Sequence, residues 1–66
     1  MAEFQINIAA CRANVGLSQA ELAKKLGVST PTLISWEKGK TEPKISTYKT
    51  IGQICGIPFE YIRLGN

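Results

Sequence analysis

The sequence contains no histidine and no aspartate, and its five acidic residues are all glutamate. A histidine general base, a histidine-centred catalytic triad and the usual mixed metal sites are therefore excluded. The two cysteines, Cys11 and Cys55, have neither CxxC spacing nor a histidine to accompany them. Because no nucleophile–base pair remains, we expect no catalysis, no metal and no cofactor.

Long apolar runs are also missing. No run approaches the roughly 20 residues that a membrane span requires. The first five residues lack the basic start and the apolar stretch of a secretory signal. These absences predict a cytoplasmic protein without a membrane partner. In a reducing compartment, we expect Cys11 and Cys55 to be free thiols packed in the core.

The residues that are present suit one small packed unit. With 66 residues, of which 44% are hydrophobic, the chain has the composition of a globular domain and room for one only. We therefore expect a single domain over residues 1–66. The net charge of +3 favours an acidic partner, most commonly nucleic acid, although a solvated basic surface would give the same sign.

Glycine and proline divide the chain into spans whose apolar residues have helical rather than alternating spacing. In the first span, Phe4, Ile8, Cys11 and Val15 form one stripe. The sequence predicts an all-α fold, a compact bundle of five helices. These helices cover about residues 4–15, 18–26, 29–38, 46–55 and 58–64.

The second and third spans carry strong boundary signals. Ser18 and Glu21 form a capping box, and Gly27 stands where a helix end requires a positive φ. Ser29 is the expected N-cap of the next helix, and the small Ala23 permits a close approach between the two. Because only three residues connect them, the two helices must cross steeply, which predicts a helix-turn-helix.

Three segments then carry a resemblance. The stretches LSQAELA (17–23), LGVS (26–29) and WEKGK (36–40) resemble the phage repressor/Cro/Xre-type family of helix-turn-helix regulators. The resemblance implies a five-helix bundle of the lambda-repressor-like type, with the helix-turn-helix formed by helices 2 and 3. It also implies a transcriptional regulator, usually a repressor. Such a regulator binds a double-stranded DNA operator as a homodimer. It is encoded by a bacterium or a phage and is associated with the nucleoid.

The outward face of the third span is the expected reading surface. The resemblance places Thr30, Pro31 and Ser35 at base-reading positions, and the place of Thr32 in the first turn adds a fourth candidate. Family members often carry Arg or Gln there, which contact bases in bidentate fashion. The short side chains of this sequence predict modest direct readout, with more weight on DNA shape.

Phosphate contacts are expected from residues that flank this surface. A helix N-terminus favours an anion, and lysines after the third span provide a cluster of positive charge. The candidates are Gln19, Lys38, Lys40, Lys44, Ser46 and Thr47. Each lysine taken singly would be a solvated surface charge, whereas the cluster beside a reading helix indicates a phosphate footprint.

Two charged residues are expected to be structural. Arg12 neighbours the apolar stripe of the first span, and Glu37 lies on the inward side of the third. In the resembled family, residues at these places pair across the domain, so the resemblance implies a buried Arg12–Glu37 ion pair. Trp36 is expected in the core.

The last span leaves a second function open. Phe59, Tyr61, Ile62 and Leu64 are many apolar side chains for so short a helix, and some must be exposed unless another chain covers them. An antitoxin-like protein-interaction module would use this surface. A homodimer that forms only on DNA would use it as well, with Tyr61 and Leu64 as the self-contact.

Overall fold

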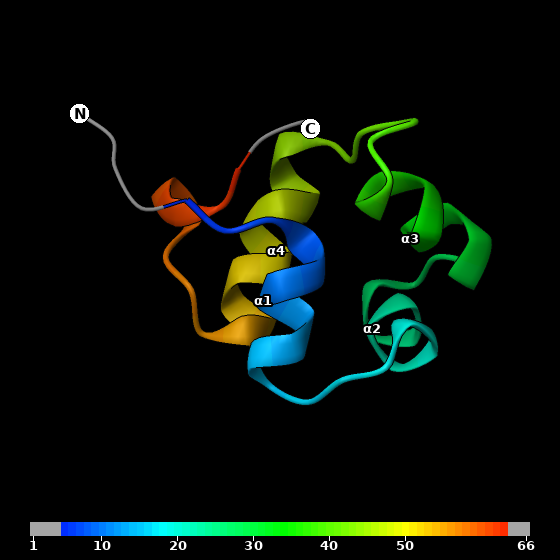
Figure 1. Cartoon of the computed structure of the whole chain (residues 1–66), viewed down its shortest axis with the longest axis horizontal. Helices are drawn as coiled ribbons and strands as arrows, with labels where there is room; N and C mark the ends of the chain where they lie inside the picture. Colours follow the sequence, from blue (N-terminus) through cyan, green and yellow to red (C-terminus); the bar gives the residue numbers. More distant parts are fainter. Residues whose placement is uncertain (1–4, 64–66) are drawn as a thin grey trace.

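The computed structural model describes residues 5–63, which form an all-helical domain. Residues 5–63 contain four α-helices followed by one 3-10 turn, η1, and Figure 1 shows how the helices are arranged. Within the described range, the one trace of β-structure is an isolated parallel bridge between Ile6 and Ile62. The elements are α1 (Ile8–Asn14), α2 (Gln19–Leu26), α3 (Thr30–Glu37), α4 (Ile45–Cys55) and η1 (Phe59–Tyr61).

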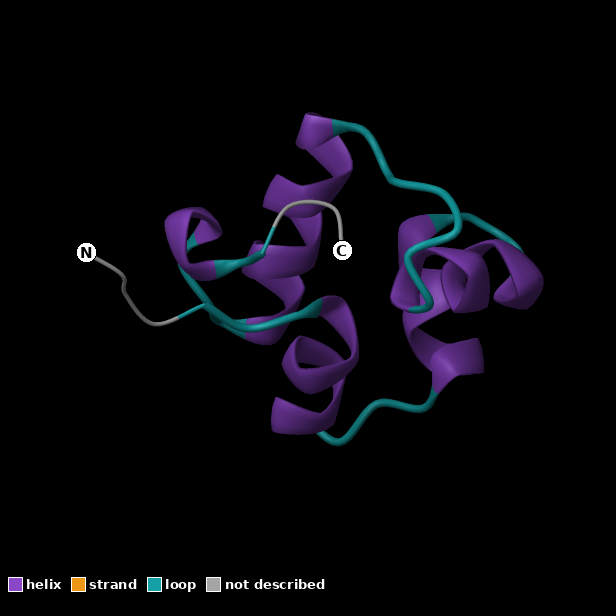
Figure 2. Ribbon diagram, turned by 45° about the horizontal axis from the view of Figure 1, so that its top comes forward, coloured by secondary structure: helices purple, strands orange, loops and turns teal. Residues whose placement is uncertain are grey.

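The helices form two pairs that share one core. Figure 2 shows α1 and α4 in one group and α2 and α3 in the other, joined by the loops 15–18 and 38–44. The residues between them are almost completely buried. They are Ile8, Cys11, Leu22, Ala23, Leu33, Tyr48, Ile51, Cys55 and Ile62. Trp36, expected in the core, packs against this cluster but is only partly buried.

Local hydrogen bonds account for the start and end of α2. The Ser18 hydroxyl accepts the backbone N–H of Glu21 at 3.1 Å, and the Glu21 carboxylate accepts the N–H of Ser18 at 2.7 Å. This reciprocal capping box satisfies two donors that a helix start otherwise leaves unpaired. At the other end, Gly27 has a φ of 75°, which an L-residue reaches only under strain.

The connection to α3 is equally local. Ser29 accepts the backbone N–H of Thr32, and Pro31 lies in the first turn, where its missing N–H costs no helical hydrogen bond. Ala23 is 1% exposed, so the helices of the pair approach closely at a small side chain. The sequence signals of both helices therefore act where they were expected.

The expected count of five helices is wrong, because the fifth span is a 3-10 turn of three residues. Pro58 begins this turn without a side-chain cap, and the chain leaves it at Ile62 in an extended conformation. Ile62 then lies against Ile6, with hydrogen bonds from Ile6 N to Tyr61 O (2.8 Å) and from Arg63 N to Ile6 O (2.9 Å). Leu64 lies outside the described residues.

The first helix is shorter than expected. Asn7 caps it by accepting the N–H of Ala10 at 2.8 Å, so α1 begins at Ile8 rather than near residue 4. The preceding residues are extended because Ile6 pairs with the C-terminal segment. Phe4, which the apolar stripe included, lies outside the described residues.

Both cysteines are free and buried. Burial raises the pKa of the Cys11 thiol to about 11, and it also raises the pKa of Cys55. Among residues 5–63, no helix is long and apolar enough to cross a membrane, and no group of three or more potential ligands is placed to hold a metal.

Candidate nucleic-acid interface

The helix α3 presents one face to the core and the opposite face to solvent. Leu33 is fully buried, whereas Pro31 is exposed on the other side. Thr30, Thr32 and Ser35 are half-buried. The four expected base-reading residues thus lie on the first two turns of α3, and Pro31 is more accessible to solvent than the other three.

Two of the expected reading hydroxyls already have partners within the domain. The Thr32 hydroxyl lies 2.8 Å from the Ser29 hydroxyl, and the Ser35 hydroxyl lies 2.9 Å from that of Thr41. A hydroxyl has one proton and two lone pairs, so each still has bonding capacity for a base edge. These contacts restrict the rotation of the side chains and give them fixed directions.

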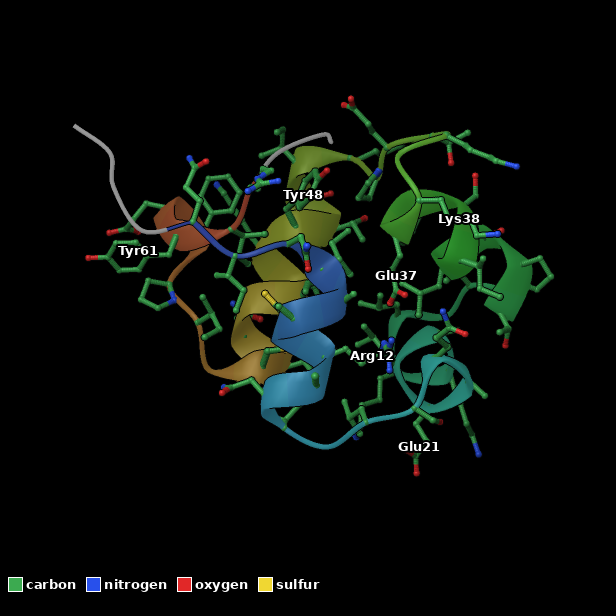
Figure 3. All side chains as sticks on the ribbon, viewed as in Figure 1. Arg12, Glu21, Glu37, Lys38, Tyr48 and Tyr61 are labelled. Carbon is green, nitrogen blue, oxygen red and sulfur yellow. The ribbon has the colours of Figure 1, made fainter. Side chains whose placement is uncertain are left out.

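The far end of α3 is anchored by Glu37. Arg12 donates to its carboxylate from Nε to Oε2 at 2.9 Å and from Nη2 to Oε1 at 3.4 Å. Gln19 donates from Nε2 to Oε1 at 2.9 Å. Arg12 also donates to the carbonyl of Leu17 at 3.0 Å. Figure 3 shows Arg12 and Glu37 directed toward one another between α1 and the α2–α3 pair.

This cluster fixes α3 relative to α1 and α2. The side chain of Glu37 is 7% exposed and that of Arg12 is 20% exposed, so the pair is largely shielded from water. A buried carboxylate is tolerated when it is paired and hydrogen-bonded, as here. Because Arg12 neutralises Glu37, the one carboxylate of α3 adds little repulsion toward an approaching phosphate.

Gln19 has a role that the sequence did not reveal. We expect it to contact phosphate, and within the domain its amide nitrogen donates one proton to Glu37. A primary amide nitrogen carries two protons, so a second remains for an outside acceptor. The contact with Glu37 depends on two helices crossing, and no spacing within the sequence signals it.

Positive charge gathers in the loop between α3 and α4. The segment 38–44 contains Lys38, Lys40 and Lys44, all exposed, against the single acid Glu42. Figure 3 shows Lys38 at the solvent side of α3. The helix α4 follows directly, beginning at Ile45 rather than Ser46, with Lys44 as its N-cap and no side-chain cap hydrogen bond.

The start of α4 therefore differs from the starts of α2 and α3. Its first backbone N–H groups have no capping side chain, and the helix dipole makes such a start attractive to an anion. Ser46 is exposed and Thr47 is half-buried, so both hydroxyls lie near this end. The lysines of the preceding loop reinforce the same electrostatic preference.

The C-terminal turn lies far from this surface. Figure 1 places α3 and η1 at opposite ends of the molecule. Tyr61 is 42% exposed, whereas Ile62 is 2% exposed and belongs to the core. Lys49 lies over the ring of Phe59, 5.6 Å from its centroid, and both line a shallow groove between α4 and η1. The expectation of exposed apolar surface therefore holds for Tyr61 and not for Ile62.

Comparisons with known proteins agree with this architecture. The helix-turn-helix family matches residues 8–62 of the chain. An uncharacterised HTH-type transcriptional regulator of Methanocaldococcus jannaschii is 45% identical over 51 residues, which is 77% of each chain. The transcriptional repressor RstR of the cryptic phage CTXphi, from Vibrio cholerae, is 33% identical over 55 residues. Antitoxin HigA1 of Mycobacterium tuberculosis is 47% identical over 38 residues.

The relatives differ in how much of their length is matched. The chain covers half of the phage repressor and 26% of the antitoxin. The archaeal match extends the range of similar proteins beyond the bacteria and phages that the resemblance implied. No solved structure matches the chain at a significant level.

Proposed function

Since this chain belongs to the helix-turn-helix family, we propose that it is a sequence-specific transcriptional regulator that places α3 in the major groove of an operator. The observation that carries the proposal is the anchoring of α3. Glu37 ties its far end to α1 and α2, while its opposite face, with Pro31 exposed, points away from the core. A rigid helix that presents small polar side chains fits the groove without steric conflict.

The residues divide into two roles under this proposal. Thr30, Pro31, Thr32 and Ser35 contact base edges, since they occupy the first two turns of α3. Phosphates on either side are held by charge and by N–H groups at the starts of α2 and α4. The residues assigned to phosphate are Gln19, Lys38, Lys40, Lys44, Ser46 and Thr47.

We further propose that the chain represses transcription as a homodimer on a partly palindromic site, within the cytoplasm at the nucleoid. One α3 of eight residues spans about 12 Å and covers few base pairs, so two copies are needed for high specificity. If Tyr61 makes the self-contact, the two long axes must be inclined, because η1 and α3 lie at opposite ends. Only then do the two α3 helices lie about 34 Å apart, one DNA turn.

The test is selection of bound sequences from a random duplex pool, followed by affinity measurements at several salt concentrations. With about four to six phosphates neutralised per protomer, log K should fall with log[salt] by roughly 0.9 per contact. Lys40→Ala should weaken binding to all sequences alike and reduce that slope by about one unit. Lys49→Ala, at the opposite end of the domain, is the matched control and should leave the slope unchanged.

Failure to enrich any sequence would contradict the proposal. A change of base preference in Lys40→Ala would contradict the division of roles. The dimer is tested separately with Tyr61→Ser, which should reduce cooperativity on a palindrome and leave half-site affinity unchanged. Unchanged cooperativity would move the dimer contact elsewhere.

A second function is favoured by one observation, the 47% identity to antitoxin HigA1. An antitoxin-like module would bind a protein through the end of the domain that carries η1, where Tyr61 is exposed. Light scattering of the chain with and without duplex DNA separates the two functions. A regulator gains mass on DNA, whereas a module that serves only as a protein partner does not.

A further inference from the structure

The loop after α3 is fixed against the end of that helix. The backbone N–H of Lys40 donates to the carbonyl of Ser35 at 3.0 Å, and that of Gly39 donates to Trp36 at 3.1 Å. Pro43 is buried. These contacts hold the backbone of the loop beside the end of α3, which places the Thr41 side chain next to Ser35.

The two hydroxyls share a hydrogen bond of 2.9 Å in which either oxygen can donate. The direction matters for recognition. If Thr41 donates, the proton of Ser35 is free and Ser35 donates to an acceptor on a base. If Ser35 donates, only its lone pairs remain and Ser35 accepts from a donor on a base. Thr41 therefore controls what Ser35 can read.

A DNA phosphate bound beside Thr41 would decide the direction. Thr41 is exposed and lies in the loop between Lys40 and Lys44, which the proposed function assigns to phosphates. A phosphate oxygen only accepts, so the Thr41 proton points to it and the Thr41 oxygen accepts from Ser35. Successive donation in one direction also strengthens each bond of the chain.

We propose that Thr41 is a specificity-determining residue, which turns the Ser35 hydroxyl into an acceptor and thereby selects a base with an exocyclic amino group. In the major groove these groups are N6 of adenine and N4 of cytosine. A guanine or thymine at the same position would oppose its O6 or O4 to a Ser35 lone pair. The inference rests on the proposed function and adds the base class that this position reads.

The experiment compares the base preferences of the full chain and its variants. Sequences are selected from a random duplex pool, and the position whose preference disappears in Ser35→Ala is the one that Ser35 reads. The wild type should prefer adenine or cytosine there. Thr41→Val keeps the shape and removes the hydroxyl, so it should reduce that preference about fivefold, the value of one neutral hydrogen bond. Thr41→Ser should retain it.

The matched control is Thr50→Val, which removes a threonine hydroxyl that donates to the carbonyl of Ser46 on α4. It should leave every base preference unchanged. A second test changes the base in the DNA and compares the wild type with Thr41→Val. If adenine is selected, a purine without the amino group at that position should weaken wild-type binding about fivefold, and it should not weaken binding by Thr41→Val. If cytosine is selected, the same test uses a pyrimidine that lacks the 4-amino group.

The contrary results separate a failure of the inference from a failure of the proposed function. A wild-type preference for guanine or thymine, or a preference unchanged in Thr41→Val, would overturn the inference and leave the proposed function intact. If Thr41→Val loses affinity equally for all sequences, Thr41 acts only as a phosphate contact, and the inference is again overturned. If the wild type enriches no sequence, the proposed function fails together with the inference.

Discussion

Two turns of this domain begin alike and end differently. After α2, Gly27 has a φ of 75°, and after α4, Gly56 has a φ of 72°. In both turns the next residue bonds back into the helix, from Val28 N to Ala23 O and from Ile57 N to Gly52 O, each at 3.0 Å. The α2–α3 turn nevertheless leads into a helix of eight residues, and the α4–η1 turn leads into a 3-10 turn of three.

The difference lies in the residue that begins the new element. Ser29 accepts a backbone N–H from the first turn of α3, whereas Pro58 has no side-chain acceptor to offer. Beyond the start, α3 is held at its end by Glu37, and η1 is followed by Ile62, which pairs with Ile6. A common helix stop thus does not determine which element comes after it. The cap and the next long-range contact do.

The largest effect should come from the long-range contact of α3. In Arg12→Met, the shielded Glu37 loses its positive partner and keeps only Gln19, which should lower the free energy of unfolding by about 3 kcal/mol. Denaturant titration measures the loss. A second change, Glu37→Leu, should restore much of it. If the double-mutant cycle shows no coupling, α3 is held by its cap and apolar packing alone.

The two glycines should be equally sensitive. Gly27→Val and Gly56→Val should each destabilise by about 1–2 kcal/mol, since a β-branched residue is forced to positive φ. An added Cβ meets no atom within 4 Å at either position, so we expect the positive φ to be the main cost at both. Thermal melting measures both. Values that differ by more than about twofold would show that the two turns are not equivalent.

Removal of the Ser29 hydroxyl gives α3 the uncapped start that η1 has. Ser29→Ala should cost about 1 kcal/mol, because the N–H of Thr32 loses its acceptor. Ser46→Ala removes a serine hydroxyl that caps no helix and serves as the control in the same melting experiment. An equal effect of both variants would argue against the N-cap as the difference between the turns.

The smallest expected effect is a pH dependence of stability, which the start of α2 should show and the start of α3 should not. The backbone N–H of Ser18, helped by its side chain, lowers the pKa of Glu21 below the usual 4.5. A lowered pKa means that this contribution is present above pH 4.5 and is lost as the pH falls through the lowered value. Glu21→Gln should reduce the acid sensitivity of the melting temperature. The start of α3 has no carboxylate cap, so Ser29→Ala should leave that sensitivity unchanged.

The parts that were predicted well from sequence depend on neighbouring residues. The all-helical class and the helix-turn-helix are confirmed. Ser18, Gly27 and Ser29 act within a few positions of themselves, so their roles are legible in the sequence. The prediction of a fifth helix is wrong because the apolar spacing of that span does not indicate that Ile62 pairs with Ile6, at the other end of the chain.

In the candidate site, too, the positions within one helix could be predicted from the sequence, whereas the contacts between elements could not. The resemblance supplied the outward positions of α3, which remain predictions as base contacts. No sequence pattern indicated that Gln19 would donate to Glu37 or that Thr41 would meet Ser35. Both contacts join elements whose relative placement is set by the packed core, and no periodicity within one element encodes them.

The pairing of Ile6 with Ile62 has a kinetic consequence. It joins the two ends of the described chain, so its formation closes a loop as long as the whole domain. Loop-closure entropy grows with loop length, so this pairing is unfavourable until the packed helices have brought the two ends together. We expect the helices to assemble first and the ends to join last. The amide hydrogens of Ile6 and Arg63 should then exchange with solvent through local openings, well before those of the buried core of α4.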